Sequence, residues 1–291
     1  MTLRKFAFQL ACLVQLFAGQ AIAQTCELNP ELTRVVTRVE TGGTLKLDDG
    51  SEVVLIGALP PVLIDDPNGA TGAWPPAETS RKALEALVSG KAIDLAFSGR
   101  RLDRYGRLLA HVFVQHDQER LWVQGHLIEQ GFSRAYGLPG NQACIDELLA
   151  HERLARTQHL GHWNSGVFQD RDGNGPRELA RFGDTFQTVE GRVARSTKIR
   201  GQYVLDFDPD GRSGFSIWLA PTKKGRRNAF QSSDLVGKRV RARGWIEVRR
   251  GPRLTLDDSR HIEILDETPE PPDADATQNA NPSPPIPAVA R

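Results

Sequence analysis

Short segments in which apolar and polar residues alternate recur along the first half of the chain, with segments of helical periodicity between them. Alternation at every second residue is typical of strands with one buried face, whereas apolar residues three and four positions apart are typical of an amphipathic helix. The pattern predicts strands at 34–39, 44–47, 53–56, 92–97 and 108–115, and helices at 78–88, 122–130 and 144–159. This order favours a small barrel decorated by helices over a parallel sheet.

The second half contains several short alternating segments and little helical periodicity. Strands are predicted at 189–193, 203–207, 215–219, 239–248, 254–256 and 262–265, separated by glycine-containing turns, which indicates a second small β-barrel. We therefore expect a first domain at 30–166, a linker at 167–181 and a basic second domain at 182–266. Residues 267–291 are rich in proline and poor in large apolar residues, so a disordered tail is predicted there.

The first residues have the pattern of an export signal. Arg4 and Lys5 precede an apolar run at 6–18, and Ala21-Ile22-Ala23 supplies small residues before a cleavage point. The apolar run is too short for a comfortable membrane span, and no later segment reaches that length. The sequence predicts a signal peptide at 1–23 and a mature protein that is periplasmic or secreted.

The cysteine count fits this compartment. Cys12 leaves with the signal peptide, and the exported remainder keeps Cys26 and Cys144. An even number of cysteines in an oxidising compartment favours one disulfide, and the alternative is two unpaired thiols. The full chain has a formal net charge of only +1, so any attraction for a polyanion must come from local asymmetry.

The segment Asp103-Arg104-Tyr105-Gly106-Arg107, directly before an apolar strand, is the most informative motif in the chain. Together with four other pieces it resembles the staphylococcal nuclease (thermonuclease-like) family, over about residues 35–163. The other pieces are Gly42-Gly43-Thr44-Leu45-Lys46-Leu47, the stretch from Val53 to Pro61, Gly131-Phe132-Ser133-Arg134-Ala135-Tyr136, and Leu160-Gly161-His162-Trp163. The resemblance implies an α+β protein, mainly β with helices. It would contain an oligonucleotide-binding (OB) fold, with a five-stranded barrel and three helices, before the second, OB-like barrel.

The resemblance also implies a catalytic site, of which this chain keeps little. In the family two aspartates hold calcium, a glutamate serves the attacking water and two arginines grip the phosphate, which together stabilise a strongly anionic transition state. The positions matching the aspartates, the glutamate and the first arginine are Gly43, Leu59, Val62 and Val54. Arg107 is the only family arginine retained.

Tyr105 lies beside Arg107 in the sequence, and Tyr136 matches a tyrosine of the family's phosphate site. A glycine, a valine and a leucine cannot bind calcium or clamp a phosphate, so the resemblance predicts a degenerate catalytic site with no cofactor. The alternative is a rearranged site in which Glu40, Asp65 or Asp66 binds calcium beside Arg107.

Clusters of basic residues suggest what such a fold would bind. Arg100, Arg101 and Arg104 flank the turn, and residues 181–266 contain 18 Lys and Arg against 11 Asp and Glu. In the second domain the basic candidates are Lys223, Lys224, Arg226, Arg227, Arg241 and Arg243, with aromatic residues at Tyr203, Phe215, Trp218 and Trp245. Cations interleaved with aromatic residues suit single-stranded nucleic acid or another polyanion. The alternative is that the aromatic residues fill the barrel core and the charges are merely solvated.

Three functions remain open from the sequence. The first is binding of nucleic acid or another polyanion by a degenerate nuclease fold, and the second is an active metal-dependent phosphodiesterase. The third is an envelope module that binds protein. His151, His159 and His162 do not have the spacing of a zinc site, and we expect them on helix surfaces.

Overall fold

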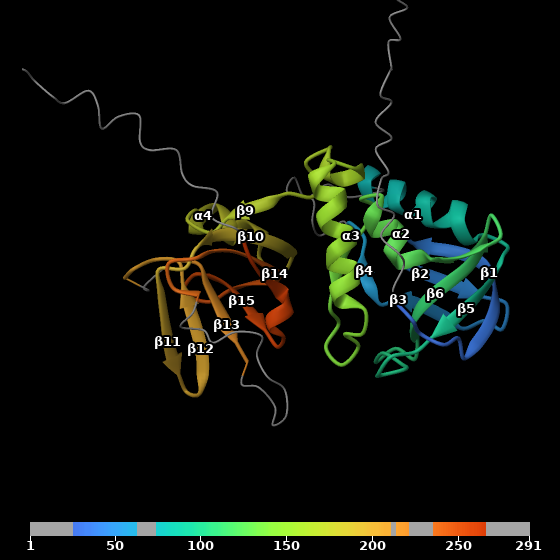
Figure 1. Ribbon diagram of the computed structural model, residues 1–291, viewed down its shortest axis with the longest axis horizontal. Helices are drawn as coiled ribbons and strands as arrows, with labels where there is room; N and C mark the ends of the chain where they lie inside the picture. Colours follow the sequence, from blue (N-terminus) through green and yellow to red (C-terminus); the bar gives the residue numbers. More distant parts are fainter. Residues whose placement is uncertain (1–25, 63–73, 211–213, 221–234, 266–291) are drawn as a thin grey trace, which may run out of the picture.

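A computed structural model describes residues 26–62, 74–210, 214–220 and 235–265. The predicted signal peptide at 1–23 and tail at 267–291 lie outside these residues. Figure 1 shows two β-rich units side by side, with α3 (Ile145–Thr157) of the first unit facing the second. Within the described residues no helix is long and apolar enough to cross a membrane.

The first unit is the predicted five-stranded barrel. Its six-stranded sheet has the order β3-β2-β1-β5-β6-β7. A parallel pairing of β3 with β6 closes the first five of these strands into the barrel, and β7 extends the sheet from β6. Along that seam Val53, Val54 and Leu55 pair with Leu108, Leu109 and Ala110. The sheet strands are β1 (Leu32–Thr41), β2 (Thr44–Leu47), β3 (Glu52–Leu55), β5 (Ala92–Ala96), β6 (Leu108–His116) and β7 (Glu119–Trp122), and a separate pair joins β4 (Gly57–Leu59) to β8 (Arg134–Tyr136).

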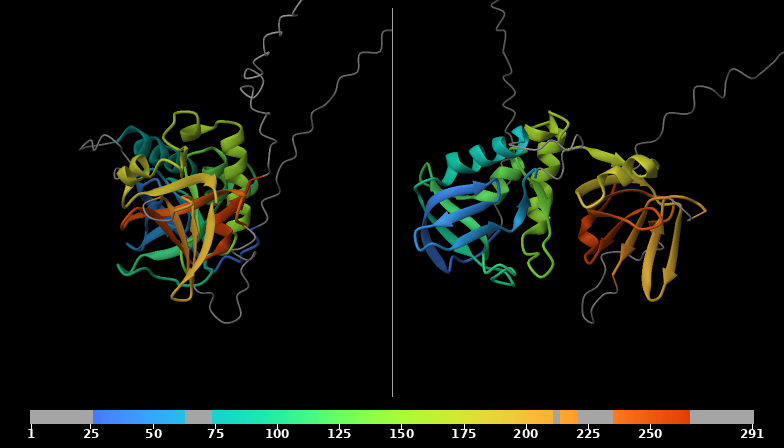
Figure 2. Two further views of the ribbon diagram at one scale, coloured as in Figure 1. Left: turned by 90° about the vertical axis from the view of Figure 1, so that its left-hand side faces the viewer. Right: turned by 180° about the vertical axis from the view of Figure 1, so that it is seen from behind.

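Three helices cover this barrel, as the sequence predicts (Figure 2). They are α1 (Pro75–Val88), α2 (Val123–Glu129) and α3 (Ile145–Thr157), followed by the short 3₁₀ helix η2 (Gly161–Trp163). Helix α1 begins at Pro75, three residues before the predicted start, with both prolines in its first turn. Proline is tolerated there because the first amide groups of a helix have no intrahelical partner.

The second unit is an eight-stranded, barrel-like sheet around its own core. Its strand order is β11-β12-β13-β15-β14-β10-β9, and β16 pairs with β14. Its strands are β9 (Asp170–Asp172), β10 (Phe186–Arg192), β11 (Arg195–Ile199), β12 (Gln202–Asp206), β13 (Ser216–Leu219), β14 (Arg239–Val248), β15 (Pro252–Leu256) and β16 (Ile262–Ile264), with short helices α4 (Pro176–Leu179), η3 (Ala180–Phe182) and η5 (Ser259–His261).

The segment predicted as a linker is structured. It contains β9, which pairs in parallel with β10, and α4, whose Leu179 is buried in the second core. Phe168 packs against Trp163 at a ring-centroid distance of 5.4 Å, so the chain leaves the first unit in contact with it. Strand β9 therefore ties the connecting segment to the sheet of the second unit.

A disulfide joins Cys26 to Cys144, as the cysteine count favours. The Cα atoms lie 5.4 Å apart, and the closed loop spans a sequence separation of 118 residues. Crosslinking a loop of this length stabilises the fold by roughly 5 kcal/mol in the chain-entropy model. The bond fixes the start of the described chain to the residue before α3.

Two of the three histidines expected on helix surfaces are buried. His159 is exposed, whereas His151 and His162 are only 1% and 5% exposed. The Ser80 hydroxyl donates to the carbonyl of Phe132 at 2.7 Å and lies 2.9 Å from His162 Nε2. Because that hydroxyl proton is already used, the contact requires a proton on Nε2. His162 thus links α1 to η2 in its neutral form.

Burial lowers the pKa of His162 to about 4. The pKa of an unfolded histidine is about 6.5. The folded pKa is therefore the lower one, and the stability that this residue contributes is present above pH 6.5 and is lost as the pH falls towards 4.

We predict that the pH dependence of stability changes in His162→Gln, which keeps an amide donor for Ser80. The stability difference between the wild type and the variant should shrink by about 3 kcal/mol between pH 7 and pH 4. Urea unfolding of both proteins across this range measures it. A stability difference that does not vary with pH would contradict the prediction.

Candidate nucleic-acid interface

Asp103 holds the turn from Asp103 to Arg107 together. Its Oδ1 accepts hydrogen bonds from the backbone amides of Tyr105 and Arg107 at 2.8 and 3.0 Å, and its Oδ2 accepts one from Arg107 Nε at 2.7 Å. Burial acts to raise the pKa of Asp103, but the bonds from Arg107 and Tyr105 outweigh it and lower the pKa. Gly106 has a φ of 78°, a backbone conformation that favours glycine. The hydrogen bonds of Asp103 and the conformation of Gly106 together hold the turn in shape, and all of these residues belong to the turn itself.

An aromatic ring flanked by cations is exposed on this turn. Tyr105 is 67% exposed, and the guanidinium carbons of Arg104 and Arg107 lie 4.9 and 5.3 Å from its ring centroid. Within the described residues Arg104 has no ion pair, while the Arg107 side chain remains 34% exposed beside Asp103. We call Arg104, Tyr105 and Arg107 the Tyr105 platform.

The two arginines before the platform differ in their surroundings. Both Arg100 and Arg101 are exposed. Arg101 forms an ion pair with Glu31 at 2.7 Å and stacks 4.0 Å from the centroid of Phe97. The structure describes no ion pair for Arg100, whose carbonyl accepts a hydrogen bond from Asn141. Arg100 is thus the more available cation of the two, and the roles predicted for both stay predictions.

The strands bring together several positions that the resemblance assigns to catalysis. Gly43 directly precedes β2, and its carbonyl accepts a hydrogen bond from the amide of Leu55 at 2.9 Å. Val54 pairs with Thr44, and a Cβ added to Gly43 would lie 3.2 Å from the side chain of Pro60. Leu59 ends β4, next to Pro60.

A cavity of about 310 Å³ opens beside these positions. Its carboxylates belong to Glu40, which is hydrogen-bonded to Arg38 at 2.8 Å, and Glu78, which makes two 2.8 Å bonds to Arg81. Both acids are therefore engaged by guanidinium groups. The lining residues are Glu40, Thr41, Gly42, Pro60, Pro61, Val62, Trp74, Ala77, Glu78 and Arg81.

The donor set that the structure describes here does not fit calcium. This ion requires six to eight oxygen ligands, which usually include free carboxylates. The matched positions carry Gly43, Val54 and Leu59, and the acids of the neighbouring cavity are paired with arginines. Asp65 and Asp66, the other acids of the rearranged-site alternative, lie outside the described residues.

The second unit covers the strand that carries Tyr136. The ring of Tyr136 makes edge contacts with Phe186 and Trp245, at centroid distances of 5.3 and 6.5 Å. Burial is the main cause that raises the pKa of its phenol. Tyr136 therefore lies at the junction between the two units, surroundings that differ from those of an open phosphate site.

Arg243 and Arg241 do not form the exposed basic strand that the sequence predicts. Arg243 is 1% exposed, and its Nη1 lies 2.5 Å from Glu152, a residue of α3 that is equally buried. Its other terminal nitrogen contacts Glu263. Arg241 contacts Asp170 at 3.2 Å, Glu263 at 3.3 Å and also Glu190. Their assignment to nucleic-acid binding is thus corrected, because carboxylates neutralise both groups.

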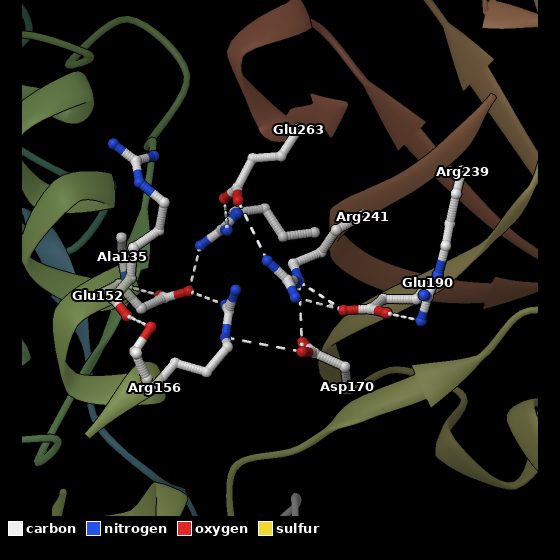
Figure 3. A network of polar contacts seen from close by, with 11 residues as sticks. Ala135, Glu152, Arg156, Asp170, Glu190, Arg239, Arg241 and Glu263 are labelled. Atoms are coloured by element: carbon white, nitrogen blue, oxygen red, sulfur yellow. Dashed lines mark hydrogen bonds and ion pairs between the residues drawn. The ribbon is translucent and has the colours of Figure 1, made fainter. Parts of the chain in front are cut away.

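These contacts form a network of ion pairs between the two units, as Figure 3 shows. Arg156 adds contacts with Glu152 at 2.5 Å and with Asp170 at 3.6 Å. Burial acts to raise the pKa of Glu152, but Arg243 and Arg156 outweigh it and the pKa is lowered. We call Glu152, Arg156, Asp170, Glu190, Arg241, Arg243 and Glu263 the interdomain network.

The remaining candidates of the second unit are divided between core and surface. Phe215 is 1% exposed and lies in the core, in agreement with the alternative prediction that aromatic residues fill the barrel core. Tyr203 and Trp245 are 38% and 40% exposed, and Arg253 lies 5.0 Å from the centroid of Trp218. The other predicted cations, Lys223, Lys224, Arg226 and Arg227, lie outside the described residues.

Comparisons with known proteins agree with the fold. Residues 62–165 match the family model described as staphylococcal nuclease homologue. Over 144 residues the chain is 33% identical to the SPbeta prophage-derived endonuclease YokF of Bacillus subtilis, covering 47% of this chain and 46% of that protein. Over 104 residues it is 36% identical to endonuclease YncB of the same organism, covering 35% and 47%.

The first unit is therefore a staphylococcal nuclease-like domain. The chain spans under half the length of these two relatives, at 46% and 47%. The family match begins at residue 62, after β4, so it does not include the segments that contain Gly43, Val54 and Leu59. The family match ends at residue 165, before β9 and the other strands of the second unit.

The interdomain network leads to a prediction about stability. In Arg243→Ala, Glu152 and Glu263 lose their buried partner, so the free energy of unfolding should fall by about 3–5 kcal/mol. The matched control is Arg239→Ala, on the same strand, whose side chain is 58% exposed beside Glu190 and whose loss should cost less than about 1 kcal/mol. Urea unfolding measures both, and equal losses would contradict a buried role for Arg243.

Proposed function

We propose that this protein binds single-stranded nucleic acid, or a polyanion with similar chemistry, through a nuclease-type fold that has lost catalysis. The Tyr105 platform carries the proposal, since it offers a ring that is 67% exposed and has two guanidinium groups within 4.9 and 5.3 Å of its centroid. A base can stack on an exposed aromatic face, while arginine donates paired hydrogen bonds to phosphate. Arg100, exposed just before the platform, supports this assignment.

The loss of catalysis rests on the residues at the matched positions. Gly43, Val54, Leu59 and Val62 provide no carboxylate and no guanidinium group. Phosphodiester cleavage needs stabilisation of a developing negative charge, and losing one such group commonly lowers the rate by roughly 10²–10³-fold. With four replaced, binding is the function that the remaining residues support best.

Export is part of the same proposal. The Cys26–Cys144 disulfide supports it, because stable disulfides are typical of oxidising compartments. The signal-peptide pattern at 1–23 supports it from the sequence. We infer that the mature protein begins shortly before Cys26 and acts in the periplasm or outside the cell.

The relatives favour a second candidate function. YokF and YncB are both named as endonucleases, at 33% and 36% identity. An active phosphodiesterase would require a rearranged site that combines Arg107 with Glu40, Asp65 or Asp66 and a divalent cation. The present pairings of Arg107 with Asp103 and of Glu40 with Arg38 argue against it.

We predict that the Tyr105 platform determines oligonucleotide affinity. Tyr105→Ala should weaken binding of a fluorescent single-stranded oligonucleotide by about 1–3 kcal/mol, whereas Tyr105→Phe, which keeps the stacking face, should bind like the wild type. Arg104→Ala should reduce the slope of log affinity against log salt by about 0.7, the value for one phosphate contact with a single strand.

The control for these variants is Arg153→Ala on α3, an exposed arginine without an ion pair in the described part of the chain. It should leave the affinity and the salt slope almost unchanged. Equal effects of Arg153→Ala and Arg104→Ala would contradict a specific role for the platform. Absence of binding at low salt would overturn the proposal and favour the protein-binding module.

A cleavage assay separates the two candidate functions. We expect no calcium-dependent cleavage of single-stranded DNA or of RNA above the level of a blank, and the same result for Arg107→Ala. Gel analysis of labelled oligonucleotides with calcium or with a chelator measures this. Cleavage that requires calcium and disappears in Arg107→Ala would establish the phosphodiesterase instead.

A further inference from the structure

A buried imidazole without hydrogen bonds lies beside the disulfide. His111 occupies the middle of β6 and is 1% exposed, and neither ring nitrogen has a hydrogen-bond partner in the described structure. Its ring packs against Trp122 at a centroid distance of 5.7 Å. Buried polar groups are usually hydrogen-bonded, and an unsatisfied one costs about 1–3 kcal/mol. In the disulfide-bonded protein, neither nitrogen of this imidazole takes part in a hydrogen bond that the structure describes.

The geometry around His111 is close to that of a metal site. One ring nitrogen of His111 and the sulfur atoms of Cys26 and Cys144 all lie within 4.8 Å of one another. In a tetrahedral zinc site, bonds of about 2.3 Å to sulfur and 2.0–2.1 Å to nitrogen place neighbouring ligand atoms about 3.3–3.8 Å apart. Shifts of an ångström or two would satisfy these distances once the two sulfurs are no longer bonded.

From this arrangement we propose that reduction of the Cys26–Cys144 bond creates a Cys₂His site for a thiophilic metal ion such as Zn²⁺, with His111 as the imidazole ligand. Two thiolates and one imidazole are ligands that suit zinc or monovalent copper. The site is independent of the nucleic-acid binding proposed above. It would give His111 the partner that it lacks in the oxidised protein.

The elements around the two cysteines allow the required movement. Cys26 precedes β1 in a segment without regular secondary structure, so its displacement breaks no strand pairing. Cys144 is the N-cap residue of α3, and the amino terminus of a helix stabilises a thiolate. Asp146 and Glu147 in the first turn of α3 act against this effect. His111 itself stays fixed by its pairing with Ala96 in the barrel.

The chemistry balances with a dithiol as the reductant. The dithiol supplies two electrons and two protons, the S–S bond breaks, two S–H bonds form, and the dithiol becomes a disulfide. Zn²⁺ then replaces the two thiol protons. Burial lowers the pKa of His111 to about 4, so its imidazole is already neutral at pH 7 and releases no proton.

The test uses the mature protein, reduced anaerobically with dithiothreitol, freed of reductant by gel filtration and incubated with Zn²⁺ alone. We expect the reduced protein to retain one zinc per chain in elemental analysis and the oxidised protein to retain none. Reduced His111→Phe and His111→Gln should each bind zinc at least about tenfold more weakly. His159→Gln, which replaces an exposed histidine, should bind like the wild type.

Folding of the variants is checked separately in their oxidised forms by urea unfolding, where the disulfide holds the fold without metal. Three results would overturn the proposal. The reduced wild type could fail to retain zinc, including the case in which reduction unfolds it and zinc does not restore the fold. The His111 variants could bind as tightly as the wild type, or the oxidised protein could bind equally well.

Discussion

The guanidinium group of Arg243 forms ion pairs with a carboxylate from each of the two units, and the packing of the units against each other depends on it. Glu152 comes from α3 of the nuclease-like unit and Glu263 from β16 of the second unit. Because both Arg243 and Glu152 are 1% exposed, neither charge can return to water while the two units remain together. Breaking such a pair costs far more than breaking a surface pair. The second unit is therefore tied to the helical side of the first.

The ion pairs of Arg241 and Arg243 reduce the number of basic residues in the second unit that can attract a polyanion. Residues 181–266 contain a clear excess of basic residues, yet Arg241 and Arg243 are neutralised inside the molecule by Glu152, Asp170, Glu190 and Glu263. Only the charges left at the surface attract a polyanion over a distance. The Tyr105 platform gains importance for this reason, since Arg104 remains exposed without an ion pair among the described residues. Its neighbour Arg107 differs, because Asp103 partly compensates its charge.

The sequence predicts the barrel strands, the three main helices and the disulfide, because periodicity and cysteine count reflect local constraints. It does not reveal β4 and β8, which have only three residues each and pair across a long separation. Alternating arginines on β14 resemble a solvent-facing pattern, since nothing local shows that Glu152 lies 91 residues away in sequence and 2.5 Å away in space. The sequence likewise predicts His162 at the surface, because nothing near it in the sequence shows that it contacts Ser80 on a different helix.

The turn that carries the Tyr105 platform shows how the motif can persist without the residues that the resemblance assigns to catalysis. Asp103 organises the turn through two backbone amides and the side chain of Arg107, and Gly106 supplies the left-handed backbone. None of these interactions involves Gly43, Val54 or Leu59, so the turn keeps its shape whatever residues stand there. Its presence therefore indicates the fold, whereas the positions that the resemblance assigns to catalysis lie before β2, in β3 and in β4. The turn can be kept while these positions change, because different residues maintain it.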